Sequence, residues 1–195
     1  MASTSSIFET AASGEELANL LQSLTEPEQL SLEQTSVSCY SPGVILEDER
    51  LIRALDQPVH FVDGEFSPTA FFDAQIRGLS VNRRSHISLS DVVQLAQNRV
   101  ARVNQKKVLA SVAEAGETPP AIRKAVGYVI LSTTDLRNVR WRANGPERRV
   151  FGVYDTAKAD DPSHGDVFFL IAGKHAWRSA REALYQLAKR TLVTL

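Results

Sequence analysis

The chain has 195 residues, of which 43% are apolar and 23% are charged, and its formal net charge at neutral pH is −1. These are the values of an ordinary globular domain, and they argue against a disordered chain and against a strongly basic nucleic-acid binder. The single cysteine, Cys39, excludes an intramolecular disulfide. No apolar run reaches the length that spans a bilayer, and residues 1–25 lack the pattern of a signal peptide, so we expect a cytoplasmic protein that does not span a membrane.

The charges are sorted along the chain. Residues 1–75 hold 13 acidic and 2 basic side chains, whereas residues 76–150 hold 5 acidic and 14 basic ones. This asymmetry predicts a phosphate-rich or acidic partner for the basic part and a basic partner for the acidic part. The alternative is that the two parts pair with each other inside the molecule.

The N-terminal residues predict two helices. Ser13 with Glu16 is typical of a capping box, and a helical leucine stripe follows it, made of Leu17, Leu20, Leu21 and Leu24. Thr25 followed by Pro27 indicates the start of a second short helix. We expect residues 1–34 to form an acidic helical arm whose leucine stripe binds a protein partner, and residues 35–195 to form one domain.

The middle of the chain mixes helical and strand patterns. Residues 47–55 have an acidic first turn and an apolar side, which predicts a short helix that ends before Pro58. Residues 59–66 alternate around Asp63-Gly64, which is typical of a tight hairpin. A short strand is expected at residues 79–81, followed by a helix over residues 91–103 that Ser90 caps.

The C-terminal part predicts strands and a final helix. Residues 127–131, 150–154 and 167–171 are apolar runs of strand length, and Asn144-Gly145 indicates a hairpin turn. Residues 177–191 are amphipathic with a helical period. The fold class is therefore expected to be α+β, with a mixed or antiparallel sheet, a C-terminal amphipathic helix packed on it, and the acidic arm.

A cluster of basic and aromatic side chains flanks the Asn144-Gly145 turn. Arginines there can contact phosphates while a tryptophan stacks on a base, which predicts binding of RNA, DNA or an acidic surface. The cluster consists of Arg137, Arg140, Trp141, Arg142, Arg148 and Arg149. The alternative is that these arginines pair with the acidic N-terminal third and that the tryptophan is a core anchor.

A second basic group lies in residues 77–86. Arg77, Arg83, Arg84 and His86 surround a glycine and could hold a phosphate. The sequence has neither a GxGxxG nor a GxxxxGK[ST] pattern, which disfavours dinucleotide-binding and P-loop chemistry. The alternative is a turn with solvated basic residues.

The third candidate site is the polar loop at residues 155–166. Asp155 ends one predicted strand, and His164 and Asp166 begin the next, so the three side chains could meet and act as acid–base groups or bind a divalent metal. Their spacing matches no established ligand pattern, and an ordinary polar loop uses the same residues. We therefore expect neither a resident metal nor a cofactor.

Two segments carry a family resemblance. Residues 78–83 (GLSVNR), and the strand end Tyr154-Asp155-Thr156 followed by residues 161–167 (DPSHGDV), resemble the segments GLSVxR and D....NPxHAxI of a scattered group of small uncharacterised bacterial proteins. Asp161 stands here for the usual asparagine, and Gly165 stands for the usual alanine. The resemblance implies a bacterial origin and no particular activity.

Two functions are considered, and the sorted charges together with the absence of a recognisable catalytic set favour the first. The first is a non-catalytic accessory module that holds nucleic acid or an acidic partner on its arginine-rich face and a protein partner on its acidic arm. The second is a small bacterial enzyme acting on a nucleotide or nucleic acid, such as a transferase or nuclease, with an Arg/His phosphate pocket. The oligomeric state stays open.

Overall fold

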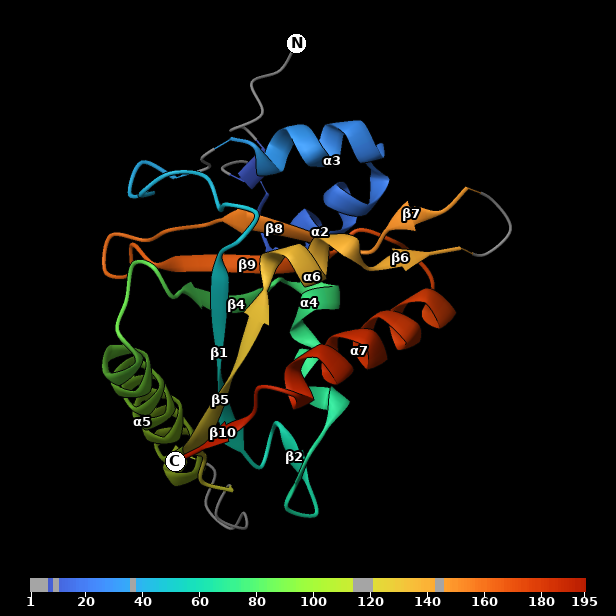
Figure 1. Ribbon diagram of the computed structural model, residues 1–195. Helices are drawn as coiled ribbons and strands as arrows, with labels where there is room; N and C mark the ends of the chain where they lie inside the picture. Colours follow the sequence, from blue (N-terminus) through green and yellow to red (C-terminus); the bar gives the residue numbers. More distant parts are fainter. Residues whose placement is uncertain (1–6, 9–10, 36–37, 114–120, 143–145) are drawn as a thin grey trace.

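The computed structural model describes residues 7–8, 11–35, 38–113, 121–142 and 146–195. Its centre is a six-stranded antiparallel sheet with the strand order β10-β5-β1-β4-β9-β8 (Figure 1). In chain order the strands are β1 (Arg50–Gln57), β4 (Leu79–Arg83), β5 (Lys124–Ser132), β8 (Phe151–Asp155), β9 (His164–Phe169) and β10 (Val193–Thr194). In Figure 1, β8 and β9 run across the view whereas β1 and β5 run down it, so the sheet is strongly twisted. The predicted α+β class with an antiparallel sheet is confirmed.

Helices and two small hairpins surround this sheet. The helices are α2 (Gly14–Ser23), α3 (Glu26–Glu33), the 3-10 helix η1 (Pro68–Phe71), α4 (Asp73–Ile76), α5 (Leu89–Ala113), α6 (Thr133–Asn138) and α7 (Lys174–Lys189). One hairpin pairs β2 (Phe61–Val62) with β3 (Glu65–Phe66), and the other pairs β6 (Arg140–Trp141) with β7 (Arg148–Arg149). Both predicted hairpins are confirmed, although Asn144-Gly145 lies outside the described residues.

Local sequence chemistry accounts for several of these elements. The Ser13 hydroxyl accepts the backbone N–H of Glu16 and starts α2, and Thr25 with Glu28 forms a capping box at α3. The β2–β3 turn places Asp63 and Gly64 at positive φ, which is the backbone that a tight hairpin requires. The long helix α5 is capped by Ser88 rather than by Ser90, because the Ser88 hydroxyl accepts the backbone N–H of Asp91.

The expectation of a helix at residues 47–55 is wrong. Most of this segment belongs to β1, which lies between β4 and β5 in the sheet. Leu51, Ile52 and Leu55 are all fully buried, because helices pack on both faces of the sheet here. A strand buried on both faces loses the alternation of apolar and polar residues, and a run of apolar residues then fits a helix equally well.

The two faces of the sheet are covered differently. The face that carries Leu51, Val129 and Val167 packs on α7, which confirms the predicted C-terminal amphipathic helix. On the opposite face, α5 covers the β1 and β5 end through Val92, which packs near Ile52. The β8 and β9 end of that same face is covered by α2 and α3. Figure 1 shows α5 and the α2–α3 pair at well-separated places on the molecule.

The N-terminal leucine stripe faces the sheet. Leu21 is fully buried in one cluster with Tyr154 and Phe168, and Leu17 and Leu24 pack at the edge of that cluster. Leu20 alone in the stripe is an exposed large apolar residue. Three of the four leucines expected to bind a protein partner therefore contact this chain's own sheet instead, because burying them there removes their apolar surface from water.

Candidate functional site

The arginines around the β6–β7 hairpin divide into buried and exposed ones. Arg149 is buried, and its Nη2 donates to both carboxylate oxygens of Glu33 at 2.6 and 2.8 Å. Arg137 donates to Glu33 Oε2 at 3.1 Å and to Glu47 Oε2 at 2.9 Å. The Arg148 guanidinium reaches the Leu24 carbonyl at 3.4 Å. The sorted charges thus pair within the molecule at this point, which is the alternative that the sequence left open.

The other members of the hairpin cluster lie at the surface. Arg140 and Arg142 are exposed, and Arg140 donates to the Arg137 carbonyl. Trp141 is half-buried and packs against the main core. Arg140 and Arg142 are thus the two exposed arginines of the six residues that the sequence predicted to bind nucleic acid.

Glu33 at the end of α3 bonds to residues of the sheet and of the β6–β7 hairpin, so its replacement is expected to lower stability. Its Oε1 also accepts the backbone N–H of Val153 at 2.6 Å, and the side chain is buried. Glu33→Gln is expected to lower the free energy of unfolding by about 1–3 kcal/mol, because the neutral amide weakens the charge-assisted bonds to Arg149. Urea denaturation measures this change. Glu47→Gln removes an exposed carboxylate from the same Arg137, so equal losses in the two variants would contradict the assignment.

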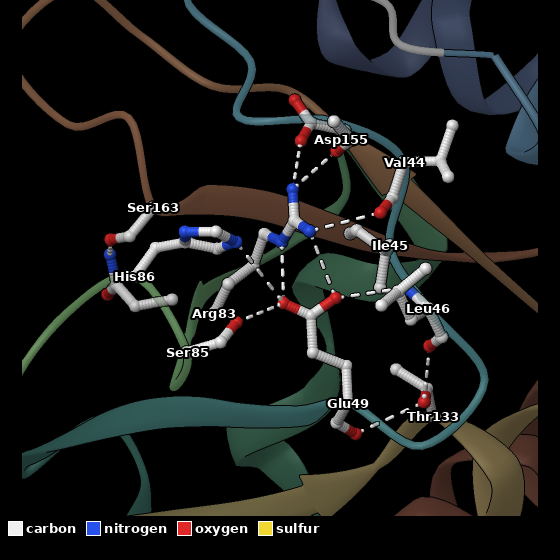
Figure 2. A network of polar contacts seen from close by, with 12 residues as sticks. Val44, Ile45, Leu46, Glu49, Arg83, Ser85, His86, Thr133, Asp155 and Ser163 are labelled. Atoms are coloured by element: carbon white, nitrogen blue, oxygen red, sulfur yellow. Dashed lines mark hydrogen bonds and ion pairs between the residues drawn. The ribbon is translucent and has the colours of Figure 1, made fainter.

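Arg83 lies at the centre of a buried ion network (Figure 2). Its Nε and Nη2 donate to the two carboxylate oxygens of Glu49 at 2.8 and 3.0 Å, and its Nη1 donates to Asp155 Oδ2 at 2.5 Å. Nη1 and Nη2 also donate to the carbonyls of Gly43 and Val44. Burial alone would raise the pKa of Glu49, but hydrogen bonds from Arg83 and Ser85 hold that pKa below its ordinary value. Arg83 is therefore a structural cation, and it has no nitrogen left for the phosphate that the sequence predicted.

The remaining residues of the second basic group line two different hollows. His86 is partly exposed with its Nε2 3.9 Å from Glu49 Oε1, and it lines a surface hollow together with Arg84. Arg77 lines a different cleft, which also contains His164. Although the Arg83 backbone N–H donates to the Ser163 carbonyl, the side chains of Arg83 and His86 line one hollow and His164 lines another, so they do not form the single pocket that the sequence suggested.

The cleft that contains His164 opens in the uncovered middle of the sheet. The strand pairing places four polar side chains on the face between the α5 cover and the α2–α3 cover, at Ser80, Asn82, His164 and Asp166. The cleft has two lobes that share Ser80, Arg99, Lys158 and His164. The larger, the Arg53 lobe, has a volume of about 530 Å³ and includes Arg53, His60 and Arg77. The smaller, the Asn82 lobe, has a volume of about 170 Å³ and includes Asn82, Arg102 and Asp161.

Hydrogen bonds fix the ring of His164 at the junction of the two lobes. Its Nδ1 lies 3.0 Å from the Thr156 carbonyl, which can only accept, so Nδ1 carries the proton of the neutral ring. Nε2 is then an acceptor, and it lies 2.5 Å from Ser80 Oγ and 3.1 Å from Lys158 Nζ. Thr156 Oγ1 donates to Asp166 Oδ2 at 2.7 Å and lies 2.9 Å from Nδ1. A basic nitrogen is thus presented to a hydroxyl and a cation.

Of the three predicted catalytic residues, two share this cleft. His164 and Asp166 both line the Arg53 lobe and connect through Thr156. Asp155 does not join them, because it belongs to the Arg83 network and also accepts the backbone N–H of Ala157. The sequence reasoning missed Ser80 and Lys158, the two side chains that contact Nε2. A polar residue between apolar neighbours on a buried strand, as Ser80 is, was the available signal.

His60 supplies a pH-dependent property at the edge of this cleft. It is buried, and burial together with the charges of Arg53, Arg99 and Arg123 lowers its pKa to about 2. Between that value and the ordinary 6.5, the unfolded chain binds a proton that the folded chain does not. His60 therefore reduces the free energy of unfolding as the pH falls below its ordinary pKa.

The pH dependence of stability is therefore expected to differ between the wild type and a variant without this histidine. On lowering the pH from about 8 to about 5, the wild-type protein is expected to lose about 2 kcal/mol more stability than His60→Gln, which has no proton to bind. Urea denaturation across this pH range measures the difference. His175→Gln replaces an exposed histidine and should follow the wild type. Parallel curves for the wild type and His60→Gln would contradict the buried neutral state.

The cleft around His164 is the main candidate site among the described residues. Within the described ranges, no three His, Cys, Asp or Glu side chains converge where they could hold a metal ion. None of the helices in those ranges is both long and apolar enough to cross a membrane. No protein-family model, curated protein or solved structure matches the chain.

Proposed function

We propose that the protein is a small enzyme that acts on a phosphate group of a nucleotide or nucleic acid, with His164 as its acid–base group. One observation carries the proposal: His164 Nε2 is oriented by the Thr156 carbonyl toward the Ser80 hydroxyl in a cleft rich in cations. A base held within hydrogen-bond reach of a hydroxyl, with a second group fixing its tautomer, is the arrangement that proton transfer requires.

The charges around His164 favour a phosphate as the reacting group. Lys158 and Arg99 line both lobes, and Lys158 Nζ lies 3.1 Å from Nε2. Fixed cations at the reaction centre stabilise the negative charge of a phosphoryl or phosphodiester group in the transition state. The cleft is therefore better suited to an anionic substrate than to a neutral one.

The residues divide into two roles in this scheme. His164 Nε2 takes the proton of the attacking hydroxyl, which is Ser80 Oγ or a water in its place, as that oxygen bonds to phosphorus and the P–O bond to the leaving alcohol breaks. The protonated His164 ring then gives its proton to the leaving oxygen, and Lys158 stabilises the negative charge on the phosphoryl group. If Ser80 attacks, water hydrolyses the phosphoserine in a second step that uses the same His164 Nε2 as base. Asp166 is a positioning residue, because it contacts His164 through the Thr156 hydroxyl and lies 3.9 Å from Nδ1. Ser80 on β4 and His164 on β9 keep their separation through the strand pairing.

A substrate panel tests the proposal. The full chain is incubated with nitrophenyl phosphate, bis-nitrophenyl phosphate, nucleoside monophosphates and short RNA and DNA, and product is followed by absorbance and chromatography. Turnover that is lost in His164→Gln is expected. Absence of turnover on every member would reject the enzyme.

The panel also examines the non-catalytic module, which remains the second candidate. The exposed side chains of Arg140 and Arg142 favour it, because they leave a basic surface beside a tryptophan. Salt-dependent binding of RNA or DNA without turnover, lost when both arginines are replaced by glutamine, would support this candidate instead. Binding that is insensitive to salt would argue against it.

A further inference from the structure

Arg53 is a buried cation with an incomplete set of partners. The side chain is only 4% exposed, and within the described residues its one carboxylate contact is Asp73 Oδ2 at 3.5 Å. The other oxygen of Asp73 accepts two bonds from Arg77, at 2.9 and 3.1 Å. Arg53 Nε is buried and has no hydrogen-bond partner among the described residues. A buried charge without a close counter-charge is unfavourable, so its presence on a cleft wall indicates an anionic ligand.

The strand geometry explains why Arg53 reaches the cleft. β1 and β4 pair at Leu51 with Arg83 and at Ile52 with Asn82, and the ladder has no pair beyond Ile52. At this point Arg53 Nη1 donates to the Ser80 carbonyl at 3.0 Å. This bond holds the guanidinium next to the residue that contacts His164.

His60 presents a second donor at the same place. His60 Nδ1 lies 2.9 Å from the backbone N–H of Asp56, which can only donate, and 3.1 Å from Asp56 Oδ1. With Nδ1 accepting from that N–H, the neutral ring carries its proton on Nε2. His60 Nε2 lies 3.4 Å from Arg53 Nη2, which also can only donate. Two donors facing each other cannot satisfy one another, whereas one anion oxygen accepts from both.

The charge balance of the Arg53 lobe indicates the kind of anion. Three carboxylates line it, at Asp56, Asp73 and Asp166, and five cations oppose them, at Arg53, Arg77, Arg99, Arg123 and Lys158. Asp56 is already shared by Arg99 at 3.4 Å and Arg123 at 3.3 Å. The excess of two positive charges matches a phosphate monoester, which carries close to two negative charges at neutral pH. An internal phosphodiester carries one negative charge and two chain substituents.

We infer that the Arg53 lobe is a subsite for a terminal phosphate monoester, with Arg53 and His60 as its donors at the buried end. This deepens the proposed function, on which it rests for the class of substrate: a nucleotide, or the phosphorylated end of a nucleic-acid strand, rather than an internal position. Arg53 and His60 are only 3% and 5% exposed, so the lobe is closed behind them. A terminal phosphate fits such a closed end, whereas an internal phosphate would need room for a strand on both sides. His164 and Lys158 line the same lobe, so the phosphate held there is the group that His164 faces.

Direct binding tests the subsite without requiring turnover. Inorganic phosphate, adenosine monophosphate, adenosine and an adenylyl-adenosine diester are titrated into the full chain by calorimetry at low salt. Inorganic phosphate and the monophosphate are expected to compete for one site, and the diester is expected to bind at least about tenfold more weakly. Equal affinity for the monoester and the diester, or no phosphate binding, would overturn the inference.

Matched variants locate the binding. Arg53→Lys keeps the charge and removes the planar fork, and it is expected to weaken phosphate binding at least about tenfold. If that variant does not fold, Arg123→Gln at the partly exposed rim should weaken binding severalfold, while Arg84→Gln outside the cleft should leave it unchanged. An equal loss in Arg123→Gln and Arg84→Gln would reject the site. Phosphate binding without turnover of any substrate would reject the enzymatic function but would still support the phosphate subsite. Turnover without a preference for monoesters would support the enzymatic function but would reject the subsite.

Discussion

Arg83→Ala is expected to lower the free energy of unfolding by about 3–5 kcal/mol, the largest stability loss that we predict for a single substitution. The change leaves the carboxylates of Glu49 and Asp155 buried without their cation, and both are almost inaccessible to water. It also removes the donors that hold the carbonyls of Gly43 and Val44. Urea denaturation at neutral pH measures the loss.

Two comparisons make this result specific. Arg84→Ala removes the neighbouring arginine, which is exposed, and should change stability by no more than about 0.5 kcal/mol. Arg83→Lys keeps the charge but cannot donate to both oxygens of Glu49, so an intermediate loss is expected. If Arg83→Ala were as mild as Arg84→Ala, the network in Figure 2 would not be a stabilising element.

Elements with a local cause were predictable from the sequence. Ser13 and Thr25 cap α2 and α3 through residues three positions away, and Asp63-Gly64 determines its hairpin through its own backbone conformation. β1 was not predictable in this way, because its strand state depends on β4 and β5, which are distant in the chain. Short apolar runs are ambiguous between helix and buried strand until such partners are known.

The sorted charges illustrate the same limit. Composition showed that the N-terminal third is acidic and the middle third is basic, but it could not show whether the two meet. The pairs Glu33 with Arg149 and Glu49 with Arg83 join residues more than 30 positions apart in the chain. These pairs are internal because the N-terminal helices pack on β8, and because the chain before β1 packs beside β4. Residue counts carry no information about such contacts.

The candidate site was predictable in part. His164 and Asp166 were found because they begin a predicted strand after a polar loop, and strand ends bring such residues together. Ser80 was not found, because its contact with His164 depends on the pairing register between β4 and β9. Arg53 was assigned to a helix, and its place in the cleft follows from the point where β1 and β4 stop pairing. The positions of Ser80 and Arg53 in the cleft therefore depend on strand pairing between distant segments, which the sequence alone does not show.

His164→Gln is expected to reduce turnover of the best substrate in the panel about 100-fold to 10,000-fold, because the amide cannot take a proton from the attacking group. Glutamine retains a polar side chain of similar length, so urea denaturation should show a folded protein, and phosphate binding at Arg53 should persist. His175→Gln, an exposed histidine, is the matched control and should keep full activity. Ser80→Ala then identifies the attacking hydroxyl. A loss as large as that of His164→Gln assigns the attack to Ser80 Oγ, whereas retained turnover assigns it to water activated by the same Nε2. If His164→Gln kept wild-type turnover, the acid–base role of His164 would be rejected whatever Ser80→Ala showed.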